Sequence, residues 1–409
     1  MQPLKPPISS LTPLSQLSFR SRLTIIGVVF WGMVALIQDL DWKRGIFRAV
    51  VLVLMLATTP VLMWLVRRPE QPVPRRVCVV LAVCCAGLLC WHFFRFIQKL
   101  PEPNLYDFAT TTLSAVDALL AGKNPYSLPI DLHAEIATNP IRYQGYKYLP
   151  MMIVTYLPLG IVWGERGILM TNFILDLATV MLVFRLSSRI GSYATGWFAA
   201  LLYLSLPIVP LQIYKIGATD LAAIVPLLIA LLHLERRPGL AGLCVGLSVS
   251  TKLLPGIVFI PCYLPNSCRG RYAAGIVLGL VPTLVFLVLS PNDLIYNTVF
   301  FNANRPVDST SWLHWATPEI HLLTTVVSAL AVLGVAVHVW YNRPTIADRC
   351  GLGIVCLLSV MLSSPIVHRN YQLWWLPFFA VLLGTAAFRG VRGQGVGRGN
   401  PVLKSRGLN

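Results

Sequence analysis

Long apolar runs recur along this chain, and they constrain the fold more than any other feature. Runs near the ~20 residues that cross a bilayer as a helix occupy 23–38, 46–66, 77–97, 168–186, 194–213, 221–234, 272–290, 322–341, 351–364 and 373–388. Of the 409 residues, 56% are hydrophobic and 12% are charged, and the mean hydropathy is +0.68. A soluble domain of this size needs far more polar surface to cover its core. The sequence therefore predicts an all-α, polytopic membrane protein with about 10–13 membrane segments.

Two shorter apolar stretches, 148–164 and 239–264, are interrupted. Pro150 and Pro158 break the first, and a Ser-Thr-Lys sequence followed by Pro255 divides the second into two half-length helices. Proline removes a helical hydrogen bond, and non-helical backbone is tolerated at membrane depth only where protein buries it. Each stretch is therefore either a re-entrant pair of short helices or an ordinary kinked span.

The formal net charge of +17 comes from basic residues in short loops and tails between apolar runs. This distribution is typical of the positive-inside rule for membrane proteins. A nucleic-acid-binding protein would instead gather its basic residues on one soluble face, so we expect no nucleic-acid partner. With the basic loops inside, the loops 98–148 and 291–320 face outside. The chain then divides into a cytoplasmic tail (1–22), a single transmembrane domain (23–388) and a basic cytoplasmic tail (389–409).

Asp107 opens the most polar segment of the first outer loop. Residues 108–121 have an amphipathic pattern that ends at Gly122 and Pro125, which predicts a helix lying at the membrane interface. The helix dipole holds a carboxylate at a helix N-terminus in its ionised form. Taken alone, Asp107 is either a simple acidic cap of a surface helix or a functional group.

The order of features after Asp107 is more specific than any one of them. They are "ALLAGKNPY", "YKYLP", a polar "GATD" before a span, and "GLAGLCVGLSVSTKLLPGIVFIP". This order resembles the polyprenyl-phosphate-sugar-dependent glycosyltransferases of the GT-C superfamily, above all glycosyltransferase family 87, the bacterial mannosyltransferases that extend phosphatidylinositol mannosides and related glycans. The resemblance covers roughly residues 100 to 380, and it is strongest in "LLAGKNPYS" and "AGLCVGLSVSTKLLP". It implies a GT-C-like fold.

The resemblance also implies a catalytic base. In that superfamily, an aspartate of the first large outer loop takes the proton of an acceptor hydroxyl as this attacks the anomeric carbon, and Asp107 matches that position. The implied enzyme is an inverting glycosyltransferase, whose leaving group departs as a phosphate monoester and needs little acid assistance. Asp117 lies ten residues later, ~80° around an ideal helix, and is the less suitable base. The "ATTT" after Asp107 departs from relatives, which often have a tyrosine there.

Basic side chains should stabilise the charge that develops on the leaving phosphate. The candidates for binding the donor phosphate are Lys252, Lys215, Arg305, His368 and Arg369. Lys252 lies within an apolar stretch, where an ammonium is costly unless paired or hydrated, although it could instead be a loop lysine at a span boundary. The alternative for the other four is an interfacial anchor or part of an aromatic belt. Asp220, in "GATD", is a candidate second carboxylate for the acceptor or a cation, although relatives often carry an amide there.

The sequence also bears on the class of donor and on bound cofactors or metals. It has no soluble Gly-rich or Asp-x-Asp nucleotide-binding domain, which argues against a nucleotide sugar as donor. Its nine cysteines show no disulfide framework or zinc spacing, so we expect no cofactor and no bound metal in the site, while a divalent-metal requirement stays open.

We therefore expect a hexosyltransferase that uses a polyprenyl-phosphate sugar as donor and a glycolipid or cell-envelope glycan as acceptor, among membrane lipids. The sugar is mannose-like or another hexose or pentose, and the site lies on the extracytoplasmic face of a bacterial cytoplasmic membrane. The competing class is a transporter or flippase of lipid-linked sugars without transferase activity. The absence of an internal inverted repeat speaks against it.

Overall fold

The computed structural model describes residues 75–103, 105–127, 145–304, 306–307 and 311–388. Within these ranges the regular elements are helices, without a strand, which confirms the all-α fold class. The predicted tails 1–22 and 389–409 lie outside the described residues, and so do the apolar runs 23–38 and 46–66. The expected total of about 10–13 membrane segments therefore stays a prediction.

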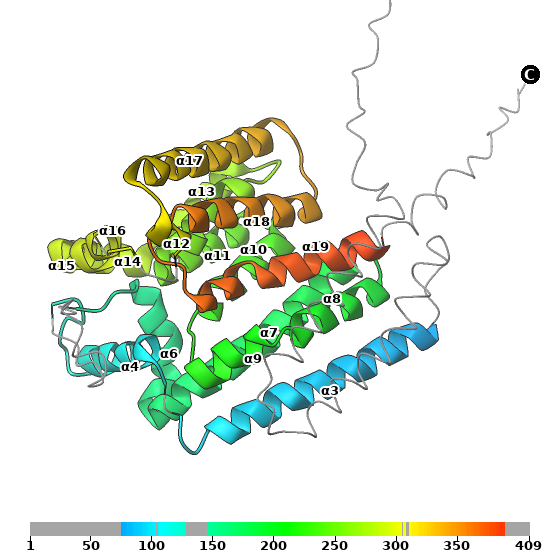
Figure 1. The fold of residues 1–409 in the computed structure, drawn as a ribbon, viewed down its shortest axis with the longest axis horizontal. Coiled ribbons are helices and arrows are strands. Elements are labelled where there is room, and N and C mark those ends of the chain that lie inside the picture. Colours follow the sequence, from blue (N-terminus) through cyan, green and yellow to red (C-terminus); the bar gives the residue numbers. More distant parts are fainter. Residues whose placement is uncertain (1–74, 104, 128–144, 305, 308–310, 389–409) are drawn as a thin grey trace, which may run out of the picture.

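The α-helices are numbered as in Figure 1, and among the other elements η2 and η3 are π-helical whereas η4 and η5 are 3-10 helices. In chain order they are α3 (Arg75–Lys99), α4 (Asp107–Leu120), α6 (Pro150–Trp163), α7 (Glu165–Ile190), α8 (Tyr193–Ser205), α9 (Ile208–Pro210), η2 (Leu211–Ile216), α10 (Leu221–His233), α11 (Pro238–Thr251), α12 (Leu253–Cys262), α13 (Arg269–Gly279), α14 (Val281–Leu289), α15 (Pro291–Ile295), η3 (Tyr296–Phe300), α16 (Phe301–Ala303), η4 (Trp312–Trp315), α17 (Pro318–Tyr341), α18 (Ile346–Leu362), η5 (Arg369–Trp374) and α19 (Leu376–Phe388).

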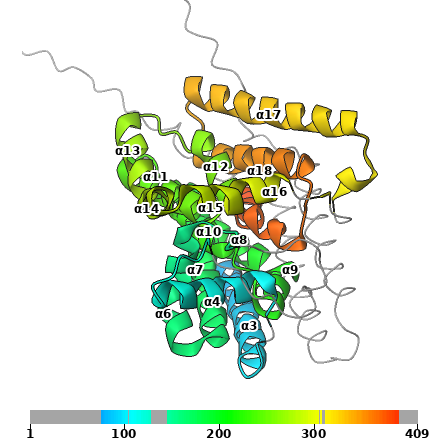
Figure 2. The ribbon, with the colours of Figure 1, turned by 90° about the vertical axis from the view of Figure 1, so that its left-hand side faces the viewer.

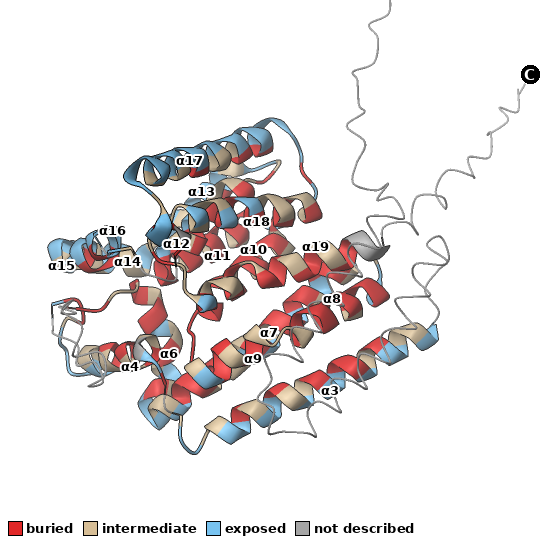
Figure 3. Cartoon of the chain, viewed as in Figure 1, coloured by how far each residue is buried: buried red, intermediate tan, exposed pale blue. Residues whose placement is uncertain are grey.

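Helices α3, α7, α8 and α19 lie side by side with similar directions, and the short elements α4, α6, α14, α15 and α16 gather at one end of them (Figure 1). Seen from that end, α4 and α15 cross in front of the long helices (Figure 2). Helices α8, α10 and α11 are largely buried, whereas α17 exposes most of its surface (Figure 3). The exposed residues of α17 include Leu322, Leu330 and Leu333. A continuous leucine-rich surface of this kind is suited to lipid and not to water.

Close packing of α11 against α13 depends on small residues. Gly242 and Gly246 of α11 face Gly275 and Gly279 of α13, each pair four residues apart on its helix. A Cβ added at Gly242 would lie 2.0 Å from the carbonyl oxygen of Tyr272, so no larger residue fits at this distance between backbones. Membrane helices use such small-xxx-small pairs to approach closely, because lipid offers no hydrophobic drive for association.

Length and composition support membrane insertion. Three described helices, α3, α7 and α17, are long and apolar enough to cross a bilayer, and up to five spans result if each of two bent helix pairs is one span. The predicted runs 194–213 and 272–290 are these bent pairs and not straight helices, with bends of 56° and 48°. Pro207 and Pro282 lie at the two bends, where a missing backbone N–H interrupts the helical hydrogen bonds.

The two interrupted stretches form short helices. In the first, α6 continues through Pro158, so the predicted break at this proline is wrong, and the helix ends before Gly164, whose φ of +56° turns the chain into α7. In the second, α11 and α12 are the two half-length helices expected from the sequence, and Lys252 joins them with extended backbone. A Cβ added at Gly256 would lie 2.5 Å from the Cα of Val249, so α12 turns back sharply against the end of α11. This contact is inconsistent with a gently kinked single helix in this stretch.

Candidate active site

A cavity of about 820 Å³ opens at the end of the bundle where the short elements gather. Its walls come from the start of α4, the segment before α6, η2, the α11–α12 junction, η3 with α16, and the segment between α18 and η5. Two of these walls are π-helical, a rare conformation that is frequent at functional sites. The cavity therefore joins segments that are far apart in the sequence, and it is the best candidate for an active site among the described residues.

Lys252 is the buried cation of this cavity. The break between α11 and α12 directs its side chain inward, and only 7% of the residue is exposed. Its Nζ donates to Oδ1 of Asp220 at 2.6 Å and lies 5.0 Å from the ring centroid of Tyr148. The carboxylate and the aromatic face both stabilise an ammonium that would otherwise be costly in an apolar environment.

Asp220 is fully buried and accepts three hydrogen bonds. Besides Lys252, Nδ2 of Asn370 donates to its Oδ2 at 2.8 Å, and Nε1 of Trp374 donates to its Oδ1 at 2.5 Å. Both donors come from η5, so Asp220 connects the start of α10 to η5 and to the α11–α12 junction. These contacts favour a supporting role for Asp220, in which it orients Lys252. Its predicted contact with an acceptor stays untested.

Helix α4 agrees with the predicted interfacial helix to within one residue at each end, and Asp107 is its first residue. Of Asp107, the structure describes the backbone and not the side chain. Its neighbours Tyr106 and Phe108 both line the cavity, and the backbone N–H of Tyr106 donates to the carbonyl of Ile216 in η2 at 3.2 Å. The start of α4 is thereby fixed to the cavity wall. In contrast, the side chain of Asp117 is exposed.

A second contact fixes the orientation of α4. The hydroxyls of Thr112 and Tyr146 lie 3.1 Å apart, and both residues are buried. Burial raises the pKa of Tyr146 well above its ordinary value, so its phenol stays neutral and serves as a hydrogen-bonding group. This pair links the middle of α4 to the segment that enters α6.

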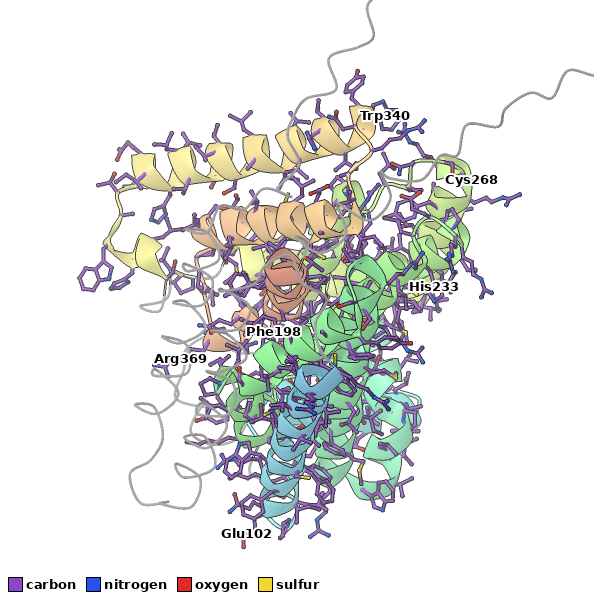
Figure 4. All side chains as sticks on the ribbon, turned by 90° about the vertical axis from the view of Figure 1, so that its right-hand side faces the viewer. Glu102, Phe198, His233, Cys268, Trp340 and Arg369 are labelled. Atoms are coloured by element: carbon purple, nitrogen blue, oxygen red, sulfur yellow. The ribbon has the colours of Figure 1, made fainter. Side chains whose placement is uncertain are left out.

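The remaining predicted cations divide into three groups. His368 and Arg369 line the cavity with Lys252, His368 half-buried and Arg369 exposed. Figure 4 shows Arg369 at one edge of the molecule, well apart from His233 and Cys268. Lys215 is exposed in η2 and is not among the described residues that line the cavity. Arg305 lies outside the described residues.

Lys147 is a cavity cation that the sequence analysis missed. It belongs to "YKYLP", and its Nζ donates to Oδ1 of Asn297 at 2.5 Å and lies 4.0 Å from the ring centroid of Phe301. Asn297 is itself fixed, because its Nδ2 donates to the backbone carbonyls of Tyr126 and Asp293. The sequence does contain a signal for this residue, because Lys147 stands directly before the apolar stretch 148–164 that is predicted to enter the membrane.

A second buried polar cluster supports the cavity from behind. Asp176 of α7 accepts from the hydroxyls of Tyr203 and Tyr214 at 2.9 and 2.6 Å, and its Oδ2 lies 2.7 Å from Nδ1 of His92. Nε2 of the same histidine lies 3.2 Å from the carbonyl oxygen of Leu204. Since Tyr214 belongs to η2, this cluster fixes a cavity wall to α3, α7 and α8. Among the described residues, no three His, Cys, Asp or Glu side chains form a group that could hold a metal ion.

Comparison with known proteins gives one family and one fold. Residues 146–365, a little over half of the chain, match the model of Glycosyltransferase family 87. The crystal structure of ArnT from Cupriavidus metallidurans bound to undecaprenyl phosphate is similar, with a TM-score of 0.51 and 15% sequence identity over 73% of this chain and 59% of that chain. The apo state of the same ArnT gives a TM-score of 0.50 at 15% identity, over 73% of this chain and 58% of that chain.

At 15% identity, the likeness to ArnT shows the fold, and it confirms the predicted GT-C-like architecture. This chain spans less than two thirds of the length of ArnT. No curated protein matches the sequence.

Proposed function

The chain belongs to glycosyltransferase family 87, and we propose that it transfers a sugar from a polyprenyl-phosphate-linked donor to a glycolipid or cell-envelope glycan. One observation carries the proposal. A single cavity combines a buried ammonium, Lys252, with the start of α4, where Asp107 stands, and with an apolar wall that includes Leu254 and Val360. A cation, a carboxylate and an apolar surface are the groups that a lipid-linked sugar phosphate and its acceptor require.

Lys252 would bind the phosphate of the donor and stabilise the charge that develops on it as the glycosidic bond breaks. The carboxylate of Asp220 compensates an ammonium in this apolar region, and the bond to Asp220 orients the side chain of Lys252. Lys147 and Arg369 line the same cavity and would add positive potential, and His368 would offer a ring nitrogen as a hydrogen-bonding group. The lipid chain would lie along the apolar wall, which opens toward the membrane in this proposal. The likeness to ArnT, whose crystal structure contains undecaprenyl phosphate, supports a lipid phosphate as ligand.

Asp107 would act as the general base. The acceptor oxygen attacks the anomeric carbon from the side opposite the phosphate, and its proton passes to the carboxylate of Asp107. The bond from the anomeric carbon to the phosphate oxygen breaks, and its electron pair leaves with the polyprenyl phosphate. One displacement inverts the anomeric configuration, and a phosphate leaving group needs no proton from the protein.

The proposal is tested by incubating the purified protein in detergent with radiolabelled undecaprenyl-phosphate sugars and a membrane lipid extract. We expect one labelled sugar to move into a more polar lipid or glycan, and the other donors to react more slowly by at least about 10-fold. Nucleotide sugars should give no product. Transfer from a nucleotide sugar in the absence of lipid-linked donor would contradict the proposed donor class.

The proposed extracytoplasmic position of the site predicts the accessibility of two loops. Ser127 follows α4 on the proposed outer side, whereas Asn342 follows α17 on the proposed cytoplasmic side, and both are exposed. In a background with the exposed Cys90 and Cys268 replaced by serine, Ser127→Cys should react with a membrane-impermeant maleimide in intact cells. Asn342→Cys should react only after permeabilisation. The opposite pattern would move the site to the cytoplasmic face.

A further inference from the structure

Gln212 has an unused hydrogen-bonding group at the cavity. It belongs to η2, only 2% of it is exposed, and it lines the cavity. Its amide Nε2 is buried and has no hydrogen-bond partner. Among the described side chains with such an unpartnered buried atom, Gln212 is the one that lines the cavity. A buried amide without a partner costs about 1–3 kcal/mol, so a ligand that supplies the partner recovers this cost.

The backbone of Gln212 is held firmly. Its carbonyl accepts from the N–H of Ala218 at 2.8 Å, where the chain leaves η2. The next residue, Ile213, is held through its carbonyl by Nδ2 of Asn172 at 3.4 Å, and Tyr214 donates to Asp176. The terminal amide torsion of glutamine is broad, so the amide can turn its N–H toward the cavity while the backbone stays fixed. The backbone of Gln212 is therefore preorganised, and only its terminal amide has to turn to bind a ligand.

Gln212 lies on the part of the cavity wall where we place the reacting end of the ligand. Ile216 lines the cavity from the same π-helical segment, and its carbonyl accepts from Tyr106, directly before Asp107. Gln212 thus lies on the wall to which the start of α4 is fixed. The cations of the cavity suit the phosphate, whereas a neutral amide, which both donates and accepts, suits a hydroxyl.

We propose that Gln212 binds a hydroxyl group of the donor sugar and thereby contributes to the choice of sugar. This inference rests on the proposed function, because it assumes that the cavity receives a lipid-linked sugar. Discrimination through a hydroxyl is effective, since a site with a buried polar group rejects an analogue that leaves this group unpaired.

The test compares the binding of undecaprenyl phosphate with that of undecaprenyl-phosphate mannose, glucose, galactose and arabinose, measured as ligand-induced shifts of the thermal midpoint. Gln212→Met keeps the length of the side chain and removes the amide. We expect the ligand-free variant to be at least as stable as the wild type, because it loses an unpartnered polar group. Its affinity for undecaprenyl phosphate should be unchanged, and its affinity for the preferred sugar-bearing lipid should fall about 3- to 10-fold.

Monodeoxy analogues of the preferred sugar identify the hydroxyl. One monodeoxy analogue should bind to the wild type about as weakly as the complete sugar-bearing lipid binds to Gln212→Met. The affinity for that same analogue should be no lower in Gln212→Met than in the wild type. The control is Asn302→Leu, because Asn302 also lines the cavity but its Nδ2 already donates to the carbonyl of Thr298. This control should weaken all analogues equally.

Three results obtained with Gln212→Met would overturn the inference. They are an equal loss of affinity for the sugar-free lipid, an equal loss for every monodeoxy analogue, and a lower stability of ligand-free Gln212→Met. A wild type that binds sugar-bearing and sugar-free lipids equally would also overturn it. These binding results are distinct from a failure of the proposed function, which would appear as the absence of transfer from donors that do bind.

Discussion

Replacing Asp107 with asparagine is expected to lower the rate of sugar transfer by about 10²–10⁴-fold, because this is the usual contribution of a positioned general base. Asparagine keeps the shape of the side chain and its compatibility with a helix N-terminus, but it does not take up the proton of the acceptor. The affinity for the donor should change little, so the loss should fall on kcat and not on KM. Initial rates with saturating donor and a defined acceptor measure this effect.

Asp117→Asn is the matched control for this experiment. It removes a carboxylate from the same helix, but from an exposed position. Transfer by this variant should stay within about a factor of two of the wild type, since exposed substitutions typically change little. Equal losses in the two variants, or near-normal turnover by Asp107→Asn, would show that Asp107 only caps α4.

Asp220→Asn is expected to destabilise the protein by about 3–5 kcal/mol, the typical result of removing one partner of a buried ion pair. The change leaves the ammonium of Lys252 without its carboxylate, and it presents an amide NH₂ to groups that also donate, Asn370 and Trp374. Thermal unfolding in detergent with an intrinsic fluorescence readout measures the effect. Asp117→Asn again serves as the control and should unfold near the wild-type temperature.

A double variant separates stability from function at this pair. Combining Asp220→Asn with Lys252→Met leaves no unpaired buried charge, so part of the lost stability should return. Transfer should not return, because the cation proposed to bind the donor phosphate is absent. Lys252→Arg alone should retain some activity, because the charge remains while the geometry of its hydrogen bonds changes. Full activity of folded Lys252→Met would exclude Lys252 from phosphate binding.

The sequence predicts the individual helices well because their causes are local. The apolar run 77–97 lies within α3, 322–341 within α17, and the amphipathic pattern after Asp107 predicts α4. The break at Lys252 also follows from local signals, a lysine and a proline in an apolar stretch. The bend directions at Pro207 and Pro282 do not follow, because they depend on the helices that pack around them.

The candidate site is less predictable, because its contacts join distant segments. Lys252 and Asp220 were both identified as candidates, but their pairing across 32 residues requires the packing of α10 against α11. Asn370 and Trp374 are not among the residues that the sequence predicts for the site, and their hydrogen bonds to Asp220 become visible only in the folded chain. Likewise, a single glutamine carries no sequence signal of its own, and Gln212 is informative only because its amide is buried beside a cavity.

The central claim is that the donor is consumed by transfer and not merely moved across the membrane, which separates a glycosyltransferase from a flippase of lipid-linked sugars. The direct test uses proteoliposomes with a doubly labelled undecaprenyl-phosphate sugar and an acceptor extract, and it counts the free undecaprenyl phosphate released per sugar incorporated. We predict one lipid phosphate released for each sugar transferred, an inverted anomeric configuration in the product, and loss of both signals in Asp107→Asn. Movement of intact donor between leaflets, without release of lipid phosphate or formation of a glycosylated product, would contradict the proposed transferase.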